Sequence, residues 1–185
     1  LNVVVREGYA VEPDTLAEDL PRYVDRMREL GLETSFATTS FHPKHLIEDT
    51  SILAAFADNG VTDVRMGYYK INPDTPLTDQ IDRARRQLTE TAEQCERHGI
   101  RVVYQVHHGT LFTNASSIHI VVKDLSPEQV GVMLDPGNQW MEGWENWHYA
   151  ARLLGVVEQL ESQRRLPASR LQHHLVEDVA SADQS

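Results

Sequence analysis

Two short runs of polar side chains follow apolar stretches and supply the residue types that metal-assisted proton transfer uses. Gln105 and His107 alternate with apolar neighbours at the end of one stretch, and Asp135 closes the next. Side chains alternate along a strand, so Gln105 and His107 are expected on one face. Amide, imidazole and carboxylate groups converging from neighbouring strand ends suit Mn2+, Mg2+, Co2+ or Zn2+. We expect Asp135 and Gln105 to hold the metal, although Asp135 also opens an Asp-Pro-Gly sequence typical of a turn.

The elements that must position these residues follow a repeating order of helix, glycine and strand. Apolar residues recur every three or four positions through residues 13–30, and Gly31 ends that helix. The same succession recurs at Gly60 and Gly99, in units of roughly 30 to 40 residues typical of βα repeats in a parallel sheet. Strands are expected at residues 1–5, 32–41, 61–71, 100–106 and 130–134.

The polar residues distinguish between the two architectures that such repeats build. A nucleotide-binding doubly wound sheet would carry a glycine-rich first turn, and no GxGxxG or GxxxxGK[ST] motif occurs. A (β/α)8 barrel instead carries its chemistry at the carboxyl ends of several strands, where the polar residues fall. We therefore predict an α/β fold, a partial (β/α)8 TIM barrel of about five βα units with a parallel sheet, over residues 1–154. Residues 155–185 are expected to form an atypical C-terminal tail.

A barrel that stops after about five of its eight strands would leave unpaired backbone groups at its edges. We accordingly expect the chain to be part of a longer barrel, to self-associate as a homo-oligomer, and to have little or no activity by itself.

Composition excludes several classes of protein. The 17 Lys and Arg residues are outnumbered by 28 Asp and Glu residues, and the formal charge of −11 disfavours nucleic acid as a partner. No apolar run is long enough for a membrane helix, so we expect no membrane partner and a cytoplasmic location. The single cysteine, Cys95, falls within a helical stripe and is expected to be a small core residue.

A second set of residues is expected to contact the substrate. By strand parity Arg65 and Tyr69 would point inward, and Arg65 would bind a phosphate or carboxylate or form an ion pair inside the barrel. Trp140 follows Asp135 and offers an aromatic face for a sugar, or else a core or subunit contact. The expected substrate-binding residues are His107, His108, Arg65, Tyr69, Asn138 and Trp140.

Three motifs on successive strand ends resemble one family in order and spacing. They are RMGYYK at residues 65–70, YQVHHGT at residues 104–110 and VGVMLDPGN at residues 130–138. Over residues 3–154 the chain resembles the sugar phosphate isomerase/epimerase family of xylose-isomerase-like barrels. The resemblance implies a small sugar or sugar phosphate as substrate, and a divalent metal held by carboxylates and a histidine. It further implies that a carboxylate removes a proton next to a carbonyl through an enediolate.

The sequence departs from that family at a position where the resemblance implies a metal ligand. Gln105 stands where many members have a glutamate ligand, and an amide oxygen is a weaker, neutral donor. His173-His174 and Glu177-Asp178 faintly echo a family segment of the form HxKD.

Three alternatives to a sugar isomerase or epimerase remain open. A lyase or dehydratase acting on a keto-inositol or 3-keto-glycoside would use the same enediolate on the same scaffold. A non-catalytic sugar-binding or subunit barrel is favoured by Gln105. An endonuclease of the related barrel superfamily is disfavoured by the acidic charge and the lack of a Lys/Arg cluster.

Overall fold

A computed structural model describes residues 1–155. Five parallel strands form one sheet in the order β1-β2-β3-β4-β5, so each strand pairs with its neighbours in sequence. Their bounds are β1 Asn2–Val5, β2 Phe36–Thr39, β3 Asp63–Arg65, β4 Arg101–Gln105 and β5 Val130–Met133. This is the α/β arrangement expected from the repeats, consistent with part of a TIM barrel.

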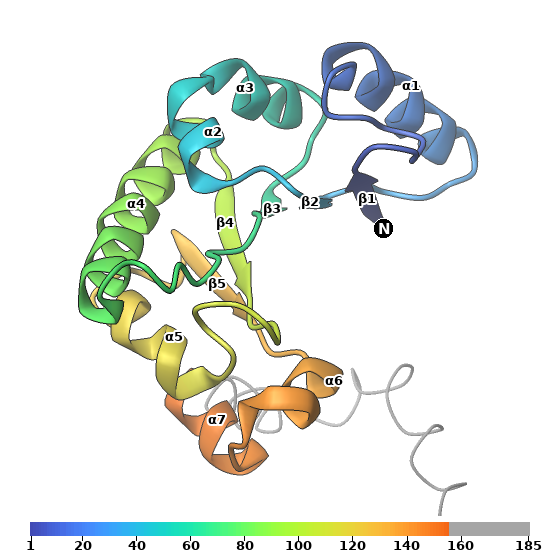
Figure 1. Cartoon of the computed structure of the whole chain (residues 1–185). Coiled ribbons are helices and arrows are strands. Elements are labelled where there is room, and N and C mark those ends of the chain that lie inside the picture. Colours follow the sequence, from blue (N-terminus) through green and yellow to red (C-terminus); the bar gives the residue numbers. More distant parts are fainter. Residues whose placement is uncertain (156–185) are drawn as a thin grey trace, which may run out of the picture.

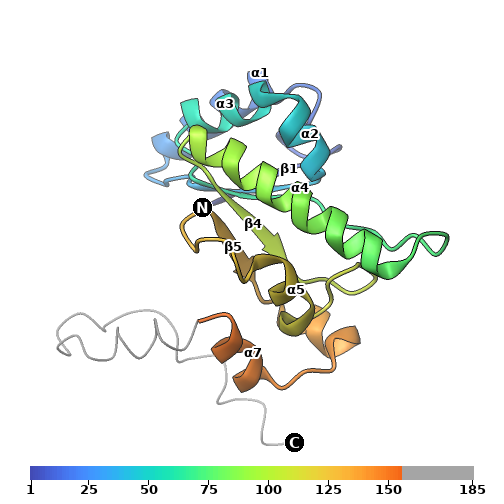
Figure 2. The ribbon, with the colours of Figure 1, turned by 90° about the vertical axis from the view of Figure 1, so that its left-hand side faces the viewer.

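The helices connect successive strands and pack around the sheet as an arc (Figure 1). Turning the view shows the long helix α4 running alongside β4 (Figure 2). The helices have these bounds: α1 Leu16–Glu29, α2 Pro43–Glu48, α3 Thr50–Asp58, α4 Leu77–Arg97, α5 Ala115–Val122, α6 Pro136–Asn138, the π-helical turn η1 Gln139–Gly143, and α7 Trp147–Leu153.

Glycine ends three of these helices in the same way, as the sequence indicated. After α1, Gly31 has a φ of +73° and donates its N–H to the Arg28 carbonyl, while Leu32 donates to Met27. The equivalent pair of hydrogen bonds follows α3 and α4. A left-handed residue is required for this turn, and glycine adopts that conformation without steric cost. Each turn leads the chain directly toward the next strand.

The core lies between the sheet and the helices. One register row crosses all five strands, and its side chains are all apolar and buried: Val3, Ala37, Val64, Val102 and Val130. The alternate side chains face the interior of the arc. This face is more polar and carries the ion pair between Asp63 and Arg101. The sheet therefore has one apolar face under the helices and one polar face.

Two expected elements differ from the structure. The strand predicted at residues 61–71 ends at Arg65, because Gly67 crosses the end of β2 and donates its N–H to the Phe41 carbonyl at 2.7 Å. The helix expected before Gly60 is divided into α2 and α3. The side chain of Asp49 caps α3 by accepting a hydrogen bond from the Ser51 N–H at 3.0 Å.

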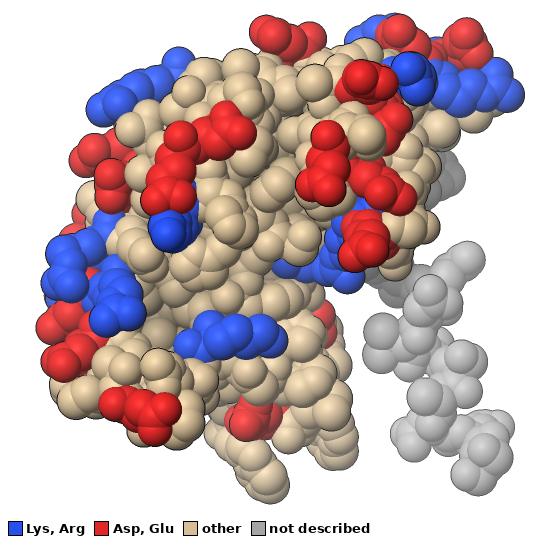
Figure 3. All heavy atoms as spheres, turned by 45° about the horizontal axis from the view of Figure 1, so that its top comes forward, with Lys and Arg blue, Asp and Glu red and all other residues tan. Residues whose placement is uncertain are grey.

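The surface over the helices agrees with the acidic composition. In Figure 3, which brings α1 and α3 forward, acidic side chains are interspersed with basic ones and no broad basic patch covers this face. None of the helices in residues 1–155 is long and apolar enough to cross a membrane. The boundary predicted at residue 155 remains a prediction, since residues 156–185 lie outside the described part.

Candidate active site

Gln105 and Asp135 form a direct contact at the carboxyl end of the sheet. The amide Nε2 of Gln105 donates to Oδ2 of Asp135 at 2.6 Å. Register explains the contact, because Gln105 ends β4 beside Met133 of β5, and Asp135 follows Met133 by one strand repeat. The juxtaposition expected from strand parity is present. Metal binding by this pair remains a prediction.

Asp135 also organises the loop after β5. Its Oδ1 accepts the backbone N–H of Asn138 at 3.0 Å, so it is both the N-terminal cap of α6 and the partner of Gln105. Partial burial raises the pKa of the Asp135 carboxyl, but the hydrogen bonds from Asn138 and Gln105 outweigh that effect and hold the pKa below its ordinary value. Asp135 is therefore an anion at neutral pH.

Tyr68 is a site residue that the sequence did not identify. Its hydroxyl donates to Oε1 of Gln105 at 2.9 Å, which fixes the amide with its nitrogen toward Asp135. The ring lies 4.7 Å from the guanidinium carbon of Arg65 and 4.5 Å from the His107 ring, centroid to centroid for the latter. Tyr68 thus connects three of the expected site residues.

Tyr69, which was expected at the site, belongs to the core instead. Only 5% of it is exposed, its hydroxyl donates to the Ala84 carbonyl of α4 at 3.2 Å, and its ring stacks on Tyr104. The parity prediction was wrong here because regular pairing stops at Arg65, and the crossing at Gly67 reverses the alternation. The sequence did offer one signal, since two adjacent tyrosines at a strand end must divide between the two faces.

Arg65 lies on the site face but is almost fully buried, with 2% exposed. Its Nη1 donates to the carbonyls of Thr39 and Met66, each at 2.9 Å. Burial lowers the pKa of Arg65, although the group remains a cation because the ordinary pKa of a guanidinium lies far above neutral pH. The ion pair that was one expectation for Arg65 is not found within residues 1–155.

His107, His108 and Asn138 form a second layer of contacts beyond Gln105. The two imidazole rings stack at 4.4 Å, and Nδ1 of His107 lies 2.7 Å from the carbonyl of His108. The side-chain oxygen of Asn138 contacts both the ring Nδ1 and the backbone N–H of His108. Because Asn138 also donates to Asp135, hydrogen bonds run from Gln105 through Asp135 and Asn138 to His108.

The loop after β5 is attached to the loop after β4 through its acidic residues. Glu142 accepts the N–H of Gly109, and Glu145 accepts the N–H groups of Ala115 and Ser116 at the start of α5. Trp140 is 89% exposed and Trp144 is 91% exposed. The substrate contact expected of Trp140 remains a prediction.

The residues proposed to hold a metal are not joined by further ligands in the described part of the chain. Within residues 1–155 no three His, Cys, Asp or Glu side chains lie close enough together to hold a metal ion. The Gln105 amide faces Asp135 with nitrogen, which is a donor group and not a metal ligand. His173, His174, Glu177 and Asp178 lie outside the described residues. A hollow of about 520 Å³ lies against β5 and is lined in part by Val103, Met133 and Leu153; Gln105 and Asp135 do not line it.

Parallel βα units with polar residues at the carboxyl ends of the strands define part of a (β/α)-barrel protein. The sequence family described as xylose isomerase-like TIM barrel matches residues 10–185, and the chain belongs to that family. No protein with a curated description matches the sequence.

Several solved structures share the fold at low sequence identity. A D-tagatose 3-epimerase-like protein is 16% identical, with a TM-score of 0.65 over 83% of this chain and 61% of its own. A D-psicose 3-epimerase is 19% identical, with a TM-score of 0.61 over 80% of this chain and 60% of its own. The 3-keto-D-glucoside 4-epimerase from E. coli is 15% identical, with a TM-score of 0.61 over 80% of this chain and 65% of its own. The chain thus spans under two thirds of each.

Proposed function

We propose that this chain carries part of the active site of an enzyme that isomerises or epimerises a sugar by moving a proton next to a carbonyl. The observation that carries the proposal is the contact between Gln105 and Asp135 at adjoining strand ends, in a chain that belongs to the xylose isomerase-like barrel family. Active sites of such barrels lie at this end of the sheet. The sugar epimerases named among the structural neighbours support a sugar as the substrate.

Within this proposal the described residues have separate roles. Asp135 supplies the negative charge that a proton or a cation requires, and Tyr68 orients Gln105 toward it. His107 lies beside the Tyr68 ring and is proposed to hydrogen-bond a substrate oxygen through its Nε2. His108 and Asn138 act through Asp135 as positioning residues.

The divalent metal implied by the family resemblance is part of the proposal, with Mn2+, Mg2+, Co2+ or Zn2+ as candidates. When bound, such a metal would polarise the sugar carbonyl. Asp135 is the donor that fits this role, whereas Gln105 as oriented fits a hydrogen bond to Asp135 better than a ligand position. The remaining ligands would come from outside residues 1–155.

The test is solvent exchange at the carbon next to the carbonyl. Because the chain by itself is expected to have little or no activity, the intact barrel that contains it is incubated in D2O with D-psicose, D-tagatose or a 3-keto-glucoside and with each metal. Deuterium incorporation is followed by NMR. We expect incorporation that Asp135→Asn abolishes. Asp63→Asn is the matched control, because Asp63 lies on the same face and pairs with Arg101 one layer below Arg65. Absence of exchange with every metal would overturn the proposal.

A non-catalytic sugar-binding barrel is the second candidate. The neutral amide at position 105 favours it, as does the lack of a three-residue metal cluster within residues 1–155. Sugar binding by calorimetry without any deuterium exchange would identify this function. Elimination products from a keto-inositol would instead identify the lyase. The expected homo-oligomer stays a prediction, and sedimentation velocity measures it.

A further inference from the structure

A smaller hollow lies beside α4, where the loops that follow β2 and β3 meet that helix. Its volume is about 180 Å³. The side chains that line it include His42 just before α2, Lys70 in the loop after β3, and Arg83 on α4. Neither Gln105 nor Asp135 lines this hollow, so it is separate from the candidate active site.

Hydrogen bonds from buried side chains hold the walls of this hollow together. Gln80 of α4 is 9% exposed, and its Oε1 accepts the N–H of Asn72 at 2.9 Å. Its Nε2 donates to the carbonyls of Asn72 and Thr75 at 2.8 Å and 2.7 Å. The Tyr69 hydroxyl donates to the Ala84 carbonyl of the same helix. The loop after β3 is therefore fastened to α4, as in pockets that are formed before a ligand binds.

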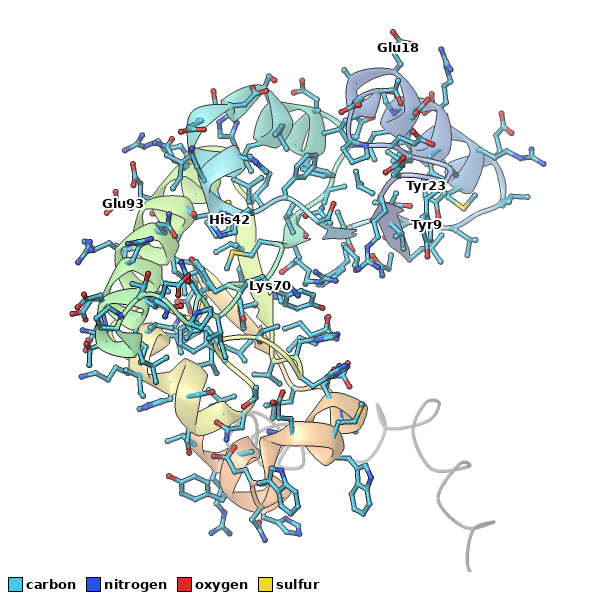
Figure 4. The ribbon with its side chains drawn as sticks, viewed as in Figure 1. Tyr9, Glu18, Tyr23, His42, Lys70 and Glu93 are labelled. Atoms are coloured by element: carbon cyan, nitrogen blue, oxygen red, sulfur yellow. The ribbon has the colours of Figure 1, made fainter. Side chains whose placement is uncertain are left out.

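The charged groups that line the hollow are positive. No Asp or Glu of residues 1–155 is among its lining residues. Neither Lys70 nor Arg83 forms an ion pair within the described part of the chain, although the three arginines of α1 each pair with an acidic residue of their own helix. Figure 4 shows His42 and Lys70 beside α4, whereas Glu93 of that helix points away from them. Two cations without acidic partners, in a chain of net charge −11, favour an anionic ligand here.

His42 contributes a hydrogen-bond donor and not a third charge. Its Nδ1 accepts the N–H of Lys44 at 3.3 Å, which leaves the ring proton of the neutral imidazole on Nε2. Burial lowers the pKa of His42, and the positive charges of His45 and Lys44 lower it further, so the ring is neutral at pH 7. The hollow therefore offers two positive charges and one neutral donor.

Apolar groups complete the lining, namely the side chains of Tyr69, Ala84 and Leu111. A ligand that matches the whole lining needs two negative charges and a short carbon chain between them. A phosphate ion carries the charge but has no chain to contact the apolar groups.

We propose that this hollow binds a small dicarboxylate, with one carboxylate on the Arg83 guanidinium and the other on the Lys70 ammonium. A guanidinium binds a carboxylate through two parallel N–H donors, and an ammonium binds it as a point charge. The carbon chain then contacts Ala84 and Leu111. Because Gln105 and Asp135 lie outside the hollow, this ligand is not the substrate of the proposed function.

The experiment measures binding and does not require turnover. The full chain is titrated by calorimetry at one low ionic strength with succinate, acetate, inorganic phosphate and D-fructose. We expect succinate to bind at least about tenfold more tightly than each of the other three, because it alone makes charge-assisted hydrogen bonds at both ends.

Variants separate a built site from a general effect of charge. Arg83→Gln and Lys70→Gln should each weaken succinate binding about tenfold. Arg86→Gln is the matched control, because Arg86 is an exposed arginine of the same helix that does not line the hollow. It should change the affinity less than about twofold, given the screening of exposed charges. Arg83 and Lys70 are exposed as well, so their replacement leaves the core intact.

Absence of succinate binding would overturn the inference, as would equal affinity for succinate and acetate or for succinate and phosphate. Equal losses in Arg83→Gln and Arg86→Gln would show an effect of charge alone and would also overturn it. Asp135→Asn should leave the affinity within about twofold, and a loss as large as that in Arg83→Gln would place the dicarboxylate at the candidate active site instead. The deuterium-exchange test is independent, so its failure leaves this site standing.

Discussion

The Tyr68 hydroxyl donates to Oε1 of Gln105, and the opposite side of the same amide donates to Asp135. A glutamine held in this way presents its amide nitrogen to the carboxylate. A glutamine that shared a metal with the carboxylate would present its amide oxygen instead. These hydrogen bonds therefore favour the contact between Gln105 and Asp135, and the metal binding proposed for the pair would require the amide to turn its oxygen toward the cation.

Gln105→Glu, made in a completed barrel, should tighten divalent-metal binding by at least about tenfold, because a second carboxylate beside Asp135 supplies a charged oxygen donor in place of an amide nitrogen. Calorimetric titration with Mn2+ measures the change. Gln105→Leu is the control, since it removes the amide without adding charge. Equal or weaker affinity in Gln105→Glu would mean that Gln105 contacts substrate and does not occupy a ligand position.

Two tyrosine variants separate the site face from the core. Tyr68→Phe keeps the ring over Arg65 but frees the Gln105 amide, and in the intact barrel we expect a loss of about tenfold in kcat/KM with little change in stability. Tyr69→Phe removes a buried hydrogen bond to Ala84 and should lower the free energy of unfolding by about 1 kcal/mol with activity retained. Steady-state kinetics and urea unfolding check both, and the opposite pattern would reverse the assignment of faces.

Gly67→Ala should destabilise the fold by about 1 to 3 kcal/mol, because a Cβ at this position would lie 2.7 Å from the Ser40 carbonyl oxygen. The next nearest atoms belong to the Phe41 backbone, at 3.1 and 3.2 Å, and backbone atoms leave little room for adjustment. Gly137→Ala provides the comparison, since its Cβ would approach the Asp135 side chain no closer than 3.4 Å. Urea unfolding of both variants gives the two values, and equal losses would contradict the close crossing.

Asp135 should give the fold a measurable dependence on pH. Its pKa in the folded protein lies below the ordinary value of 3.8, so ionisation stabilises the fold. That contribution is fully present above the ordinary value and is lost as the pH falls through the lowered pKa. Asp135→Asn keeps a good helix cap but removes the charge. Thermal unfolding from pH 6 to pH 3 should show a steeper decline in the unmodified protein than in the variant.

The sequence was most informative where local signals and strand pairing agree. The glycine stops and the alternation in β4 predicted the parallel repeat and the contact between Gln105 and Asp135. Tyr68 was not identified and Tyr69 was misassigned, because the orientation of both side chains depends on the crossing at Gly67 over β2, which is a contact distant in sequence. Whether Arg65 forms an ion pair within residues 1–155 was likewise undecided in the sequence, because it depends on which carboxylates the neighbouring strands bring near it.

The strand order has a further consequence for how this sheet assembles. Every strand pairs only with the strands immediately before and after it in sequence, so each pairing closes a loop of a few tens of residues. Loop-closure entropy rises slowly with length, and pairings of this kind let a sheet grow one unit at a time. The central strand β3 has neighbours on both sides, whereas β1 and β5 each have one within the described residues. Amide hydrogen exchange should therefore be slowest at Val64 and faster toward Val4 and Val132.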